Sequence, residues 1–308
     1  MSCIKTALPE WIEECVKTGT IREGSAQVYR SGTRTWTLPA IGRLRVNQVT
    51  REQVGAIILE IKKAKRSKSI MLHMLNPLRT MFEHLVETKK IPASPCDNLR
   101  YFTKGFGKRK EIEIFTREEI ARIKAAAEAT RPRYVAFIQF ALGTGCRWGE
   151  CAAVTWDDID FQHKKISITK SWSRNAHKLE QTKTSERRTI PLTSALAKVL
   201  RKWETVRKAE GLGDLRLVFP GTDNRHEVSW GTLWRDLLVT AKVKHRGFKT
   251  FRNCFASYNL QARVRPELVQ RWLGHATLSM TIDIYGQFIP DADGDARDAE
   301  KLGALVDC

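Results

Sequence analysis

The sequence predicts a mainly α-helical protein with one small antiparallel β-sheet, an α+β fold divided into two domains and a linker. Three observations lead to this prediction. Apolar residues recur at helical spacing along most of the 308-residue chain, strand-like alternation is confined to residues 165–192, and the composition changes near residue 100. A chain of this length can bury two cores of ordinary size.

Residues 1–100 are predicted to form a small helical bundle. The segment EQVGAIILEIKKAKR carries one apolar face, made of Val54, Ile57, Ile58 and Ile61. The next segment continues this pattern, but Pro77 lies inside it and is expected to kink or restart the helix. Pro39 and Gly42 are expected to end a weaker helix that covers residues 24–36.

Residues 101–112 are predicted to be a basic linker. The stretch IPASPCDNLRYFTKGFGKRK combines prolines and glycines with a run of basic residues. Such a linker can lie along a phosphate backbone, although a solvated run of charges is the commoner case. Residues 113–308 are then the second domain with a C-terminal tail.

Local patterns predict several elements of the second domain. Thr116 and Glu119 have capping-box spacing at a helix start, and YVAFIQFALG is predicted to be a buried helix that ends at Gly143–Gly145. KISIT and ERRTIPL are predicted strands. The helix that follows is expected to turn five residues inward: Leu196, Val199, Leu200, Trp203 and Val206.

The charge is strongly positive and unevenly distributed. The chain has 53 Lys and Arg against 34 Asp and Glu, a net charge of +19; residues 291–308 carry −4, which leaves +23 for the first 290. A surface this basic attracts polyanions, and nucleic acid is the first candidate. Basic charge alone also fits a protein with no such partner.

Cysteine spacing and hydropathy indicate the cellular compartment of the protein. None of the 7 cysteines has C-x-x-C spacing, so neither a zinc site nor a secreted disulfide framework is expected. The N-terminus lacks the apolar run of a signal peptide, and the longest apolar stretch is too short to span a bilayer. We therefore expect a cytoplasmic protein without a membrane partner.

Four stretches of the second domain carry residues suited to phosphate chemistry. They are ALGTGCRWGEC with Arg147 and Glu150, QTKTSERRTIPL with Lys183, KTFRNCFASY with Arg252, and LGHATLSMTIDIYGQF with His275 and Tyr285. Each residue alone has an ordinary explanation, such as a surface arginine, a solvated turn lysine, a helix-capping imidazole or a core tyrosine. Only the four stretches together favour an active site.

In order and in spacing, the four stretches resemble the boxes of the tyrosine recombinase (phage integrase) family, and the resemblance covers nearly the whole chain. It implies a helical, SAM-like core-binding domain at residues 1–100 and a catalytic domain at residues 113–308. Glu150 would support the site. The resemblance implies these catalytic residues: Arg147, Lys183, Lys249, Arg252, His275 and the nucleophile Tyr285.

The third box departs from the family pattern. Lys249 stands where most members have the histidine of His-x-x-Arg, and Asn253 replaces the commoner second histidine. A lysine donates to phosphate, but a cationic amine is a poor general base at neutral pH. Lys249 is therefore predicted to support the reaction electrostatically; the alternative is a surface lysine that only contacts the DNA backbone.

The resemblance implies a site-specific DNA recombinase or integrase that cuts and rejoins strands through a 3′-phosphotyrosyl intermediate and a Holliday junction. It implies no metal and no nucleotide cofactor. The expected partners are double-stranded recombination sites, a homo-tetramer, and accessory DNA-bending or directionality proteins, at the nucleoid in the cytoplasm. The tail after Tyr285 is expected to reach a neighbouring protomer, and no separate arm-binding domain is expected before the first helix.

Two other functions stay open on the sequence alone. A type IB topoisomerase-like enzyme would use the same chemistry without pairing two DNA sites. A non-catalytic DNA-binding accessory protein is the second alternative. It has no need of the tyrosine, so the complete set of Arg, Lys, Arg, His and Tyr boxes argues against it.

Overall fold

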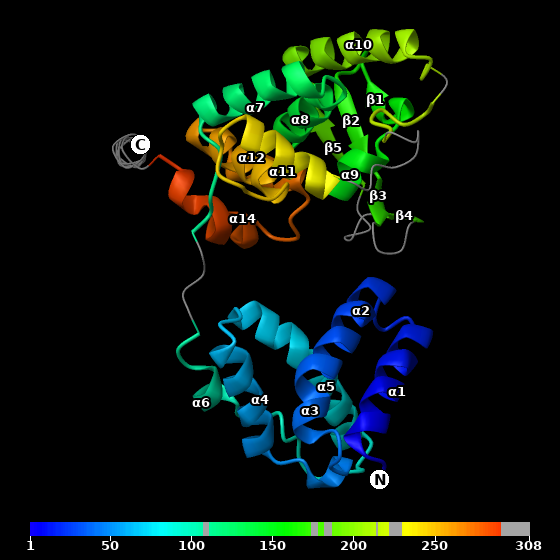
Figure 1. Cartoon of the computed structure of the whole chain (residues 1–308), viewed down its shortest axis with the longest axis vertical. Coiled ribbons are helices and arrows are strands. Elements are labelled where there is room, and N and C mark those ends of the chain that lie inside the picture. Colours follow the sequence, from blue (N-terminus) through cyan, green and yellow to red (C-terminus); the bar gives the residue numbers. More distant parts are fainter. Residues whose placement is uncertain (107–110, 174–177, 182–186, 214, 222–229, 291–308) are drawn as a thin grey trace, which may run out of the picture. The chain divides into compact units, whose positions relative to one another are not determined.

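The chain divides into two compact units, Met1–Lys110 and Glu111–Cys308 (Figure 1). The computed structural model describes residues 1–106, 111–173, 178–181, 187–213, 215–221 and 230–290. Both units are mainly helical, which confirms the predicted fold class. Across these described ranges, no helix combines the length and the apolar character needed to cross a bilayer.

The first unit is built from helices around one apolar core. Its helices are α1 (Ile4–Lys17), α2 (Glu23–Gly32), α3 (Leu38–Ile41), α4 (Arg51–Lys63), α5 (Lys68–Glu87) and α6 (Arg100–Thr103), with a π-helical turn at Thr33–Thr37 and a 3₁₀ turn at Val46–Gln48. The apolar face predicted for α4 is buried, since Val54, Ile57, Ile58 and Ile61 are all in the core. Helical periodicity alone therefore identified the core face of this helix.

Two prolines do not interrupt helices as the sequence suggested. α5 continues through Pro77 as one helix, so of the kink or restart expected there the restart is wrong; Pro77 and its neighbour Leu78 are buried in the core. Burial of this face outweighs the backbone hydrogen bond that Pro77 removes. Pro39 lies in α3, which continues directly from the π-helical turn, and the helical path ends only at Gly42.

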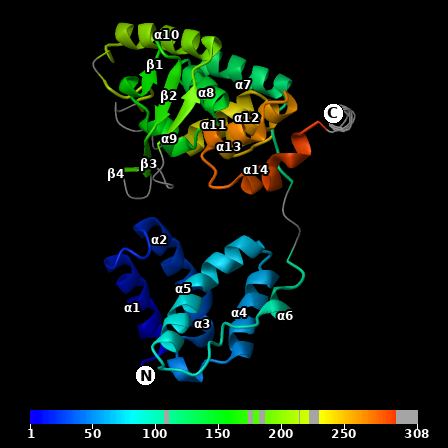
Figure 2. The same ribbon diagram turned by 180° about the vertical axis from the view of Figure 1, so that it is seen from behind.

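The second unit is a helical body with two small sheets. Its helices are α7 (Arg117–Thr130), α8 (Arg133–Thr144), α9 (Trp148–Ala153), α10 (Ser194–Ala209), α11 (Trp230–Thr240), α12 (Lys249–Gln261), α13 (Pro266–Leu273) and α14 (Leu278–Tyr285), with 3₁₀ turns at Trp156–Asp158 and Gly286–Phe288. The predicted capping box of Thr116 and Glu119 starts α7. α12, α13 and α14 pack against one another (Figures 1 and 2).

The strands form two antiparallel sheets where the sequence predicted one. β1 (Ile159–Asp160), β2 (Lys165–Ile168) and β5 (Arg188–Pro191) make a three-stranded sheet, and β3 (Lys170–Ser173) pairs with β4 (Lys178–Gln181) in a separate one. β3 leaves the first sheet to pack on α9. A Cβ at Gly149 of α9 would lie 2.5 Å from the carbonyl oxygen of Trp172, so a glycine permits this approach.

α10 faces the core slightly differently from the prediction. Leu196, Leu200 and Trp203 are buried, but Val206 is 37% exposed and Arg207 is buried in its place. The stripe 196, 200, 203, 207 follows the 3.6-residue period more closely than one that includes Val206. The NH2 of Arg207 donates to the carbonyl oxygens of Leu212 and Leu215 at 2.8 Å each, while its buried Nε has no hydrogen-bond partner among the described residues.

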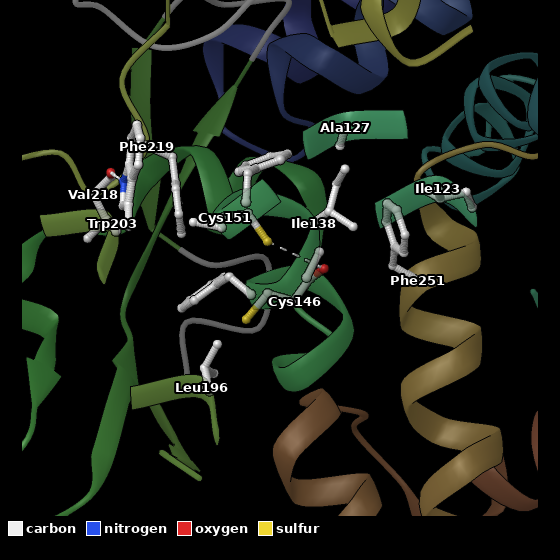
Figure 3. Packing of buried hydrophobic residues seen from close by; sticks show 14 of the residues in the cluster. Ile123, Ala127, Ile138, Cys146, Cys151, Leu196, Trp203, Val218, Phe219 and Phe251 are labelled. Atoms are coloured by element: carbon white, nitrogen blue, oxygen red, sulfur yellow. Dashed lines mark hydrogen bonds between the residues drawn. The ribbon is translucent and has the colours of Figure 1, made fainter. Parts of the chain in front are cut away.

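The core of the second unit anchors the turn between α8 and α9. Figure 3 shows Cys146, on this turn, and Cys151, on α9, among the buried apolar residues. The thiol of Cys151 lies 3.9 Å from the carbonyl oxygen of Cys146. The next residue along the chain is Arg147, so the backbone that carries this arginine is fixed by packing.

Candidate active site

Gly145 turns the chain from α8 into α9 and thereby places Arg147. Gly145 has a left-handed φ of +62°, and a Cβ there would lie 2.6 Å from the ring of Phe255. Arg147 is the N-cap of α9: its backbone N–H donates to Glu150 Oε2 at 2.8 Å, and its NH1 donates to Glu150 Oε1 at 2.9 Å. The Arg147 side chain remains 37% exposed, so it is oriented by Glu150 and open to solvent.

Glu150 is buried and also binds Arg188. Arg188 NH2 donates to Glu150 Oε2 at 2.6 Å and NH1 donates to Oε1 at 3.0 Å. Burial alone would raise the pKa of Glu150, but the hydrogen bonds and charge of Arg188, with the charge of Arg147, lower that pKa to about 2. Glu150 is therefore an anion at neutral pH, shared between two arginines.

Arg188 was missed in the sequence. It lies on β5, where Arg188 and Ile190 are buried and Thr189 between them is exposed. Strand alternation places Arg188 on the same face as Ile190, and a charged residue on an inward face needs a buried partner. This alternation along β5 was the sequence feature by which Arg188 could have been identified as a buried site residue.

Arg252 connects three segments of the second unit. It is buried on α12, and its NH1 donates to the carbonyl oxygen of Gly145 at 3.1 Å. Its NH2 donates to the carbonyl oxygen of Leu273 at 2.7 Å. Burial, together with the charge of Arg147, lowers the pKa of Arg252 to about 10, so the guanidinium is still charged at neutral pH.

His275 follows the left-handed Gly274 at the end of α13 and is buried. Its Nδ1 lies 2.9 Å from the hydroxyl of Thr281 on α14, a partner that the sequence did not indicate. Burial lowers the pKa of His275 to about 4, with further contributions from the positive charges of Arg252, Arg147, Arg188 and Lys249. The imidazole is therefore neutral at neutral pH.

Tyr285 is the last residue of α14, and only 1% of it is exposed. Its ring is parallel to that of His275, with 6.2 Å between centroids. Its hydroxyl donates to Oδ1 of Asn253 at 3.0 Å. The hydroxyl thus lies in the site and is hydrogen-bonded to a side chain of α12.

The remaining two predicted residues differ in how the structure places them. Lys249 is the exposed first residue of α12, and its charge contributes to lowering the pKa of His275. Lys183 lies outside the described residues. The structure therefore brings together every predicted site residue that it describes.

A large basic cavity lies beside His275. It measures about 790 Å³, and its lining includes Gly274 and His275. The rest of the wall has one acidic residue, Glu267, and five lysines and arginines, namely Lys164, Lys165, Arg187, Arg188 and Arg271. A wall of this charge suits a polyanion. In the part of the chain that the structure describes, no group of three or more His, Cys, Asp and Glu side chains is arranged to hold a metal ion.

Solved structures with the same fold include two integrases. The Tn1549 transposon integrase, in complex with a circular intermediate DNA, superposes with a TM-score of 0.80 at 17% identity, over 97% of this chain and 99% of that one. A λ integrase tetramer bound to a Holliday junction superposes with a TM-score of 0.69 at 18% identity, over 90% and 78%. At these identities the likeness concerns the fold.

Sequence relatives and a family-wide profile give the family. A "Tyrosine recombinase XerC-like" protein of Caldanaerobacter subterraneus subsp. tengcongensis is 30% identical over 257 residues, which are 74% of this chain and 64% of that protein. The ICEBs1 integrase of Bacillus subtilis is 21% identical, over 85% of this chain and 72% of its own length. The profile of the phage integrase family matches residues 113–288, more than half of the chain. The chain therefore belongs to the phage integrase family.

Proposed function

We propose that this chain is a site-specific DNA recombinase that cuts and rejoins strands through a covalent bond to Tyr285. The observation that carries the proposal is the pair of hydrogen bonds from Arg252 to the carbonyl oxygens of Gly145 and Leu273. They join the turn that leads to Arg147, the helix α12, and the segment that leads to His275. Cationic donors and a phenol from distant parts of the sequence thus share one site.

The charges of the site fit attack on a phosphodiester. Such an attack gathers negative charge on the nonbridging oxygens, and guanidinium groups match the geometry of phosphate oxygens. Arg147 and Arg252 take this role. In the tautomer whose Nδ1 accepts from the Thr281 hydroxyl, the neutral His275 carries its proton on Nε2 and donates a further hydrogen bond from there. Loss of one such donor typically costs about 10²–10³ in rate.

The bonds and protons balance with solvent water as the only further reactant. The Tyr285 oxygen forms a bond to phosphorus as the bond from phosphorus to the 5′ oxygen breaks, and the phenol gives its proton to water. The leaving 5′ oxygen takes a proton from Lys183, which is then reprotonated from water. The product is a 3′-phosphotyrosyl bond, and attack by a 5′-hydroxyl reverses the step and reseals a strand.

We infer the partners of this chain from those of the related proteins. The λ integrase tetramer is bound to a Holliday junction, and the Tn1549 integrase to a circular intermediate DNA. We therefore propose that this chain pairs two duplex sites as a homo-tetramer, on the DNA of the nucleoid, with accessory DNA-bending or directionality proteins. The basic cavity beside His275 supports DNA as the substrate.

Covalent trapping tests the proposal without knowledge of the target site. A library of nicked duplexes with randomised sequence lets the cut fragment diffuse away, so that each cleaved duplex stays attached to the protein. We expect SDS-stable adducts that enrich one sequence, normal DNA binding by Tyr285→Phe, and no adduct from that variant. The matched control is Tyr258→Phe, because Tyr258 is another tyrosine of the same unit, partly buried, whose hydroxyl is hydrogen-bonded. Adducts from Tyr285→Phe would refute the proposal.

A further inference from the structure

Asn253 lies between Tyr285 and the start of the second unit. Its Oδ1 accepts the hydrogen bond from the Tyr285 hydroxyl at 3.0 Å, and its Nδ2 donates to the backbone carbonyl of Glu113 at 3.4 Å. One side-chain amide therefore contacts two segments that are far apart in the sequence. Arg252, the neighbouring residue on α12, points elsewhere, toward Gly145 and Leu273.

The carbonyl of Glu113 decides which way the amide of Asn253 faces. A carbonyl oxygen only accepts, so the NH₂ end of the amide must face Glu113. The oxygen of the amide then faces Tyr285, and the phenol must act as donor. A reversed amide would place two oxygen atoms against each other at Glu113.

Residues 111–113 are held in place by charge and by packing. Glu113 accepts from Lys244 at 2.8 Å and from Arg246 at 3.1 Å. Ile112 packs against the small apolar cluster that contains Tyr285. These are also the first residues of the second unit, through which the chain arrives from the first.

The stored tyrosine must move before it reacts. With 1% of its surface exposed, Tyr285 cannot reach a phosphate from its present position. Its hydroxyl must leave Asn253 in the same step. The strength of this hydrogen bond therefore enters the rate of any reaction at Tyr285.

We propose that Asn253 is a positioning residue that stores Tyr285 while residues 111–113 are docked, and that displacement of these residues releases the tyrosine. The proposal rests on the proposed function for its consequence, but the storage itself is a property of the protein without DNA. When Glu113 moves away, the amide loses the contact that fixes its orientation. The hydrogen bond to Tyr285 is then weakened.

Chemical modification of the DNA-free protein tests the storage. Tetranitromethane nitrates accessible tyrosines, and mass spectrometry reports each tyrosine separately. We expect Asn253→Leu to raise the nitration rate of Tyr285 about fivefold, the factor that corresponds to the loss of one hydrogen bond of typical net strength. Glu113→Ala should raise it about twofold. Nitration of Tyr258 and the melting temperature report whether the fold is intact.

The double variant Glu113→Ala, Asn253→Leu tests whether Glu113 acts on Tyr285 through Asn253 or independently of it. Because Glu113 acts through Asn253, Glu113→Ala should add nothing in the Asn253→Leu background. The matched control is Asp157→Ala, which removes an exposed ion pair with Arg216 on the same unit and should leave Tyr285 unchanged. An unchanged nitration rate in Asn253→Leu, or an equal effect of Glu113→Ala in both backgrounds, would overturn the proposal.

A parallel measurement with DNA separates this proposal from the proposed function. Single-turnover adduct formation on a trapped duplex should accelerate in Asn253→Leu by the same factor as nitration. Absence of any adduct from the unmodified protein would refute the recombinase function while the nitration result still supported storage. An adduct rate that stayed constant while nitration rose would overturn the role of storage in the reaction.

Discussion

Lys249 is the first residue of α12, three positions before Arg252, and its exposed amine contributes to the positive charge around His275. If this amine donates to the phosphate in the transition state, Lys249→Ala slows single-turnover cleavage at saturating protein by about 10²-fold. Lys249→His should retain substantial activity, because an imidazole restores a donor. An exposed lysine on α10, Lys198, provides the control variant Lys198→Ala.

The alternative role of Lys249 predicts a different pattern. If the amine only contacts the DNA backbone, Lys249→Ala weakens binding and lowers its salt dependence but cleaves bound DNA at the normal rate. A normal single-turnover rate for Lys249→Ala would thus contradict the catalytic role.

The buried pair of Glu150 and Arg188 predicts a distinct response to acid. The pKa of Glu150 is lowered from 4.5 to about 2 in the folded protein, so the unfolded chain binds the proton more readily. The stability that this carboxylate contributes is complete above about pH 4.5 and is lost as the pH falls toward 2. Urea unfolding at a series of pH values should therefore show a shallower loss of stability in Glu150→Gln than in the unmodified protein.

The same variant should also be less stable at neutral pH. Removal of one partner from a buried pair typically costs roughly 3–5 kcal/mol, because Arg188 is left as an unpaired buried cation. The control Asp157→Asn disrupts the exposed pair with Arg216 and should change the unfolding far less. Parallel acid profiles for the unmodified protein and Glu150→Gln would refute this account of the lowered pKa.

At the scale of the element, the turn between α8 and α9 is the part of the site most sensitive to backbone change. Gly145→Ala imposes a side chain on a left-handed residue and places its Cβ 2.6 Å from Phe255. We expect a loss of roughly 1–3 kcal/mol in unfolding free energy. We also expect slower cleavage, since the carbonyl of Gly145 accepts from Arg252.

Gly211 provides the control for this turn. Gly211 has a φ of +74°, but a Cβ there meets nothing within 4 Å. Gly211→Ala therefore measures the loss of unfolding free energy that a left-handed backbone causes, without a close contact such as the one with Phe255. Equal losses of stability for Gly145→Ala and Gly211→Ala would show that the approach of Phe255 contributes nothing.

Local patterns predicted the elements well where one face is buried and the ends are capped. The face of α4, the capping box of α7 and the glycine end of α8 are all as predicted, because each depends on residues within a few positions. The split into two sheets was not predicted, and the sequence left open whether the helix of α5 restarts at Pro77. Both depend on which distant surface the segment packs against, and no local spacing encodes that.

The residues of the site also divide into those that local motifs predicted and those whose contacts depend on the folded structure. Motifs predicted that Arg147, Arg252, His275 and Tyr285 lie together, and the structure brings them together. Their chemical roles remain predictions. The contacts of Arg188 with Glu150 and of Asn253 with Tyr285 join residues 38 and 32 positions apart. They follow from the folded approach of strands and helices, which the sequence alone did not give.

At the scale of the whole molecule, the positive charge predicts strongly salt-dependent DNA binding. The chain carries +19 overall, and basic residues line the cavity beside His275. If six or more phosphates are neutralised, affinity falls by roughly 10³-fold or more between 50 and 200 mM salt. Replacing Lys164 and Lys165 together by alanine should reduce the slope of log affinity against log salt by about two. A flat response would mean that the charge serves another purpose.

Identification of the DNA-linked residue tests the central claim most directly. The unmodified protein is trapped on a nicked duplex, digested with protease and nuclease, and analysed by mass spectrometry. We predict a single modified peptide in which Tyr285 carries a nucleotide through its 3′ phosphate, with a free 5′-hydroxyl on the released strand. A nucleotide attached to another residue, or joined through a 5′ phosphate, would contradict the assignment of Tyr285 as the nucleophile.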